Sequence, residues 1–132
     1  MSSLKENKNK TFSSDIVDLS FLNEHLSSDL DQLSQMITIF LEQNPNKIEL
    51  LKESVSSNDF AAIKSHSHFL KSSFTIMGLS SVSCLSEIEL LSIQSKDIEK
   101  IIALSNIVMR NFNESVIEYE KIRAEILLKK KK

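Results

Sequence analysis

Apolar residues recur at helical spacing along most of the chain, and the first clear stretch follows Ser28. Ser28-Asp29-Leu30-Asp31 combines a capping residue with acids in a first turn, which is typical of a helix start. The helical spacing of apolar residues continues beyond Asn44-Pro45 and ends at Ser56-Ser57-Asn58-Asp59. Pro45 therefore either begins a second helix or kinks a continuing one. The apolar positions of this stretch are Leu30, Leu33, Met36, Ile37, Phe40, Leu41, Ile48, Leu51 and Val55.

Three further helices are predicted after this stretch, and a short one is possible around residues 19–25. One helix begins at Asn58 or Asp59 and ends at Gly78, the only glycine, where a left-handed capping residue is expected. A third helix follows from Leu79, and Asp97 caps a long last one. Because short connections join these helices, they are predicted to pack as antiparallel neighbours. The expected fold is all-α, an up-down four-helix bundle with an accessory N-terminal helical segment.

Composition supports one helical domain with polar ends. With one Gly and one Pro, the chain of 132 residues has almost no turn chemistry for a β-rich fold. We expect a disordered polar tail at residues 1–14, the bundle at 15–128 and a basic tail at 129–132. Removing the four terminal lysines from a formal net charge of −2 leaves −6, so the body is acidic. An acidic body does not favour nucleic-acid binding.

Other features of the composition indicate a cytoplasmic protein. The single Cys84 cannot form an internal disulfide and fits a reducing compartment. No stretch approaches the ~20 apolar residues of a membrane span, and residues 1–14 lack the apolar core of a signal peptide. We therefore expect no membrane partner. A monomer is expected, although the long amphipathic last helix leaves dimerisation open.

Of the three histidines, His68 is predicted to face solvent. When residues 59–77 are projected at about 100° per residue, His66 falls within the apolar arc and His68 lies about 160° from Leu70. An exposed imidazole is a nucleophile that needs no dedicated base, and flanking ammonium groups favour a dianionic group on its nitrogen. The residues on its stripe, within two turns, are Ala61, Lys64, Ser65, Lys71, Ser72 and Thr75.

The spacing around His68 makes this pattern more specific. His68-x-Leu70-Lys71-Ser72-Ser73-x4-Gly78 resembles the signature of histidine-containing phosphotransfer (HPt) domains, typically His-x-Leu-Lys-Gly-Ser-x4-Gly. The likeness extends over roughly residues 19–128, from the apolar helix containing Phe40 to Pro45, through an Asn-Asp turn, to a shorter and then a long last helix. It implies a four-helix bundle in which residues 29–57 form one kinked helix.

The resemblance also implies a function and roles for the site residues. HPt domains pass a phosphoryl group between His and the Asp of a receiver domain, and the receiver supplies Mg²⁺. By this likeness His68 is the phospho-acceptor, Lys71 stabilises phosphohistidine, and Gly78 allows the helix end to pack beneath the site. Lys64 is a second residue expected to stabilise the phosphate, selected from its position beside His68 on the helix and not from the resemblance. Ser72 departs from the family's usual Gly, which leaves the fit to a partner open.

The implied role is that of a phosphocarrier between receiver domains of a hybrid sensor kinase and a response regulator. The chain lacks the Gly-rich phosphate-cradling loop and ATP-binding features that a kinase needs, so it is not expected to be an enzyme. It is expected to bind no cofactor itself. The alternatives are a helical-bundle adaptor that binds a receiver without accepting phosphate, and a coiled-coil or DNA-binding protein. A metal site is not expected, because His66 and His68 point about 160° apart on one helix.

Overall fold

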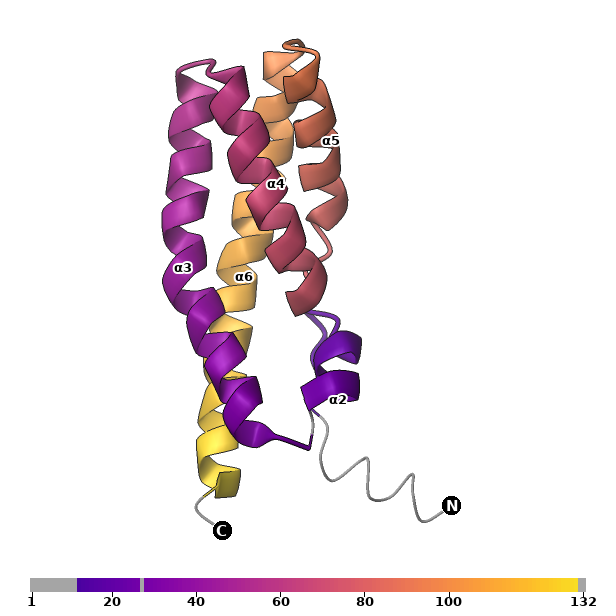
Figure 1. The fold of residues 1–132 in the computed structure, drawn as a ribbon, viewed down its shortest axis with the longest axis vertical. Helices are drawn as coiled ribbons and strands as arrows, with labels where there is room; N and C mark the ends of the chain where they lie inside the picture. Colours follow the sequence, from indigo (N-terminus) through magenta and orange to yellow (C-terminus); the bar gives the residue numbers. More distant parts are fainter. Residues whose placement is uncertain (1–11, 27, 131–132) are drawn as a thin grey trace.

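The computed structural model describes residues 12–26 and 28–130, and these form five helices (Figure 1). A short α2 (Ser20–Leu26) precedes the long α3 (Leu30–Ser56). Then come α4 (Phe60–Met77), α5 (Val82–Ile93) and α6 (Ile98–Lys130). Helices α3 to α6 lie side by side as a bundle, and α2 lies near the end where α4 finishes. The predicted all-α bundle with an accessory N-terminal helix is confirmed. No helix in the described ranges is long and apolar enough to cross a membrane.

The long helix α3 passes through Pro45 without ending. Its start is capped by Asp29, whose carboxylate accepts a hydrogen bond of 3.0 Å from the backbone N–H of Gln32. Pro45 lies inside the helix, where it removes one backbone hydrogen bond. The buried positions on either side, such as Ile37 and Leu51, keep one helical phase, so the burial of a single face holds the helix together across this break. The alternative of a continuing helix is therefore correct.

Gly78 ends α4 and lets the N-terminal segment approach closely. Asp59 caps the start of the helix by accepting from the backbone N–H of Ala62 at 3.1 Å. At the other end Gly78 has φ 72°, and its N–H donates to the carbonyl of Phe74. The N–H of Asp18 donates to the Gly78 carbonyl at 2.8 Å. A Cβ on Gly78 would lie 1.8 Å from the carbonyl oxygen of Asp18, so the position requires glycine for space and for conformation.

Aromatic rings fill the centre of the bundle. The Phe40 ring lies 5.4 to 6.5 Å, between centroids, from those of Phe74, Phe112 and Tyr119. The fully buried Tyr119 donates its hydroxyl hydrogen bond to the backbone carbonyl of Met77. Burial raises the pKa of this phenol, which therefore stays neutral. This contact ties α6 to the end of α4.

Two expected boundaries of the folded body and the expected start of one helix need correction. Phe12, assigned to the polar tail, is buried, and its backbone N–H and carbonyl both bond the amide of Asn23, at 3.0 and 2.8 Å. The last helix runs past residue 128 to Lys130, which pairs with Asp31. Leu79 precedes α5 rather than belonging to it. Local periodicity does not reveal these tertiary contacts. Of the expected tails, residues 1–11 and 131–132 lie outside the described residues.

Candidate functional site

His68 projects from the middle of α4 into solvent, as the helical projection predicted. Its side chain is 65 % exposed, whereas Leu70 and Phe74 on the opposite face of the helix are fully buried. The exposed ring is held by one contact with the neighbouring helix α5. Its Nδ1 lies 2.8 Å from Oε2 of Glu89. The acceptor candidate is therefore accessible and oriented at the same time.

Glu89 joins His68 to Lys71. Its carboxylate is largely buried, with 13 % of the side chain exposed, and its Oε1 lies 2.7 Å from the ammonium of Lys71. The hydrogen bond from Lys71 is the largest influence on the pKa of Glu89, and it lowers that pKa despite the opposing effect of burial. The carboxylate is therefore ionised at neutral pH. It contacts both His68 and Lys71, which lie one turn apart on α4.

The sequence analysis did not select Glu89, because this residue lies on another helix and 21 positions from His68. The signal that could have found it is the helical hairpin formed by α4 and α5. Lys71 lies nine residues before Ser80 and Glu89 nine residues after it. Positions equidistant from a short turn face one another when two helices run antiparallel. The hairpin register thus brings an acid from α5 to the His-containing helix.

The contact with Glu89 defines which ring nitrogen is free to react. An ionised carboxylate only accepts hydrogen bonds, so the neutral imidazole carries its proton on Nδ1. The other nitrogen, Nε2, then keeps its lone pair and points away from α5. This is the arrangement required of a nitrogen that attacks an electrophile without first losing a proton.

Two hollows flank His68, and most of the predicted site residues line one or the other. The hollow on the α5 side is lined by Ala61, Lys64, Ser65, His68 and Glu89. The hollow on the α3 side includes Ser72 and the residue Lys47, which the sequence reasoning did not select. Together with Lys71, these positions surround the imidazole.

Thr75 and Gly78 do not lie in the same immediate surroundings as His68. Both line a different hollow, beside the N-terminal segment. Thr75 donates its hydroxyl hydrogen bond to the Lys71 carbonyl at 2.8 Å. Gly78 lies ten residues beyond His68, about 15 Å along the helix axis. Its place in the structure is the packing of the helix end, as described above, rather than a position beneath the imidazole.

The other two histidines have different surroundings. His66 is half-buried with its Nδ1 enclosed, and burial together with the nearby charge of Lys47 lowers its pKa. His25 stacks on Phe21 with ring centroids 4.3 Å apart. Neither forms part of a metal site, because the described residues contain no group of three or more His, Cys, Asp or Glu placed to hold an ion.

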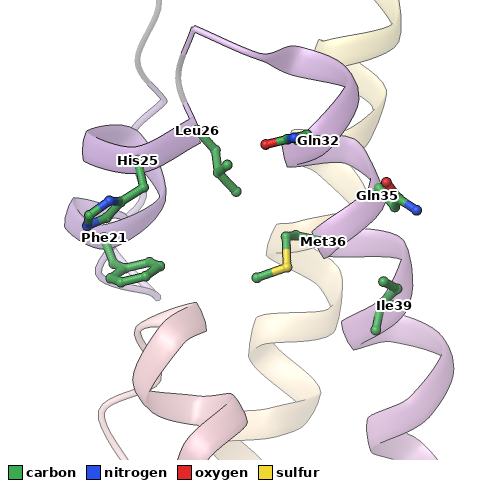
Figure 2. A pocket seen from close by; sticks show the side chains of 7 residues that line it. All are labelled: Phe21, His25, Leu26, Gln32, Gln35, Met36 and Ile39. Carbon is green, nitrogen blue, oxygen red and sulfur yellow. The ribbon is translucent and has the colours of Figure 1, made fainter.

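His25 lines a hollow of its own between α2 and α3 (Figure 2). Phe21, Leu26 and Met36 line the same gap, which has a volume of about 390 Å³ and a mainly apolar surface. The remaining lining residues, Gln32, Gln35 and Ile39, add no acid or base to His25. The carboxylate of Glu24, which does not line the hollow, lies 3.9 Å from Nε2 of His25 and is too far for a hydrogen bond.

Comparison with known proteins agrees with the fold and identifies the family. The family model described as Hpt domain matches residues 35–103, just over half of the chain. A solved structure, histidine-containing phosphotransfer protein B (HptB) from Pseudomonas aeruginosa PAO1, superposes with a TM-score of 0.77 at 18 % identity. The alignment covers 86 % of this chain and 98 % of that one. A search of curated protein sequences found no match.

An exposed histidine on the second helix of a four-helix bundle, inside the matched segment, defines the class. The chain belongs to the Hpt domain family. Its role is phosphotransfer within a phosphorelay, as a phosphocarrier domain and not as a kinase. Receiver domains are the partners of this family in such relays.

Proposed function

We propose that the chain accepts a phosphoryl group from the aspartate of one receiver domain onto Nε2 of His68 and passes it to another receiver. The observation that carries the proposal is the exposed His68 ring with its Nδ1 held by Glu89 at 2.8 Å. Nε2 is thereby left with a lone pair on the accessible side of the ring. A hybrid sensor kinase and a response regulator are the proposed owners of the two receivers.

The transfer needs no proton movement at the reacting nitrogen. The Nε2 lone pair attacks phosphorus of the aspartyl phosphate, the phosphorus–oxygen bond breaks, and its electron pair returns to the carboxylate. The ring keeps its Nδ1 proton and gains positive charge, which the carboxylate of Glu89 stabilises. The reverse steps deliver the group to the second receiver. Mg²⁺, bound by the receiver, neutralises charge on the phosphoryl oxygens.

The roles proposed for the neighbouring residues follow from their positions. Lys71 lies one turn from His68, and its ammonium pairs with Glu89, the same carboxylate that contacts the imidazole. Lys64 lines the hollow on the α5 side. Small side chains at Ala61, Ser65 and Ser72 leave room for a receiver to approach the ring, and Thr75 lies farther along the same face. We propose a monomer that acts in the cytoplasm.

The proposal is tested by incubating the purified protein with a phosphorylated receiver and Mg²⁺. The expected product is a phosphoprotein whose label is lost in acid and stable in base, since phosphohistidine has this lability. His68→Gln should abolish the label. His25→Gln serves as the matched control, because His25 lies in the separate hollow between α2 and α3 and should leave labelling unchanged.

Two results would contradict this assignment. Label that persists in His68→Gln would place the phosphate elsewhere. A wild-type chain that binds receivers and never takes up label would instead be an adaptor. Circular dichroism of both variants establishes that the bundle is intact, which is expected since both side chains are more than half exposed.

A further inference from the structure

The free nitrogen of His68 faces away from Glu89 and therefore away from α5. The two nitrogens of an imidazole lie on different sides of the ring, and Nδ1 is turned toward Glu89 of α5. On the other side of His68 lies the hollow between α3 and α4. It contains the side chains of Lys47, Ser65 and Ser72. Because His68 lines this hollow, a group carried on Nε2 can lie in it.

The cations around His68 are not equally free to bind such a group. The ammonium of Lys71 is already 2.7 Å from the carboxylate of Glu89. Lys64 lines the hollow on the α5 side, where Glu89 also lies. Lys47 comes from α3, and its ammonium lies 4.8 Å from the centroid of the Phe69 ring. Lys47 and His68 line the same hollow, so a cation is available on this side of the acceptor.

The contact with Phe69 is weak enough to be exchanged. A cation over an aromatic ring at an exposed site is worth about 0.5–1 kcal/mol, and Phe69 is 37 % exposed. A hydrogen bond between an ammonium and a phosphoryl oxygen is charge-assisted and is therefore shorter and stronger. Lys47 gains more from a dianion in the hollow than it loses by leaving the ring.

Given that His68 carries phosphate as proposed above, we propose that Lys47 binds the phosphoryl group on Nε2 and prolongs its life. The ammonium donates to a phosphoryl oxygen, while the hydroxyls of Ser65 and Ser72 line the same hollow as further donors. Ser72, which replaces the expected Gly, then contributes a polar group to the phosphate side of the ring. No bond is formed or broken by Lys47.

The test measures the lifetime of the labelled protein after the receiver has been removed. Label is delivered by a phosphorylated receiver with Mg²⁺ to wild type, Lys47→Gln, Lys47→Arg and Lys52→Gln. Lys52 is the matched control, because it lies on the same helix, is exposed and lines neither hollow. Lys47→Gln should shorten the lifetime about two- to fivefold, the size expected of an exposed ion pair. Lys47→Arg should restore it, and Lys52→Gln should leave it unchanged.

Each outcome decides a different claim. Equal lifetimes in Lys47→Gln and Lys52→Gln would remove Lys47 from the phosphate site and leave His68 as the acceptor. A lifetime in Lys47→Arg as short as that in Lys47→Gln would contradict a role for the positive charge of this side chain. A wild-type chain that takes up no label would overturn this inference together with the proposed function.

Discussion

At the scale of single residues, the site depends on a carboxylate that local sequence does not indicate. His68, Lys71 and Ser72 could be selected from spacing on one helix, because helical periodicity decides which side chains share a face. Glu89 could not, since its contact with His68 joins residues 21 positions apart. The same limit applies to Lys47, which reaches the site from α3. Contacts between helices require the register of the bundle.

Glu89 should make stability depend on pH in the acid range. The pKa of its carboxyl is lowered in the folded protein, mainly by the hydrogen bond from Lys71. A lowered pKa means that the folded state binds protons less readily than the unfolded state. The stabilisation is therefore complete above the ordinary value of 4.5 and is lost as pH falls below it.

Glu89→Gln should reduce the free energy of unfolding by about 1 kcal/mol at pH 7, and the difference from wild type should shrink below pH 4.5. Urea unfolding at a series of pH values measures both quantities. Glu87→Gln is a suitable control, because Glu87 lies on the same helix and pairs with Lys100 at a more exposed position. A difference for Glu89→Gln that stays constant down to pH 3 would contradict the proposed ion pair.

At the scale of elements, periodicity predicted the existence of the helices better than their ends. The start of α4 at Asp59 and its end at Gly78 were correct, because capping residues mark them locally. The burial of Phe12 was not predicted, since its partners Asn23 and Lys129 are distant from it in sequence. Pro45 left two alternatives, and tertiary packing of one apolar face selects the continuous helix.

The proline inside α3 should lower the stability of the bundle. Pro45 cannot donate a backbone hydrogen bond to the preceding turn, and its ring crowds that turn. Pro45→Ala should therefore raise the free energy of unfolding by about 1–3 kcal/mol. Thermal unfolding measured by circular dichroism would show a higher midpoint. A lower midpoint would mean that packing of the flanking residues depends on the proline.

At the scale of the whole molecule, the middle and the C-terminal end of α4 serve different purposes. Its middle presents His68, and its C-terminal end is joined to the N-terminal segment and to α6. Asp18 bonds Gly78, and Tyr119 of α6 bonds Met77. Disturbance of this junction should weaken the whole bundle while leaving the contacts of the imidazole in place.

Gly78→Ala should destabilise the protein by about 2 kcal/mol or more, because it combines a positive φ with a Cβ that would meet the Asp18 carbonyl. The midpoint of urea unfolding measures the loss. Ser80→Ala, at an exposed position two residues later, should change it little. An unchanged midpoint for Gly78→Ala would show that the N-terminal segment moves away at small cost. Under conditions where the variant remains folded, its His68 should still accept phosphate.

The exposure of His68 has a kinetic consequence for signalling. With 65 % of its side chain accessible, the ring can be reached without movement of the described helices. Transfer should then be limited by encounter and alignment with a receiver, so that its rate rises in proportion to receiver concentration and shows no lag. In a cell, the abundance of each competing receiver would decide how quickly the phosphoryl group leaves this protein and which receiver takes it.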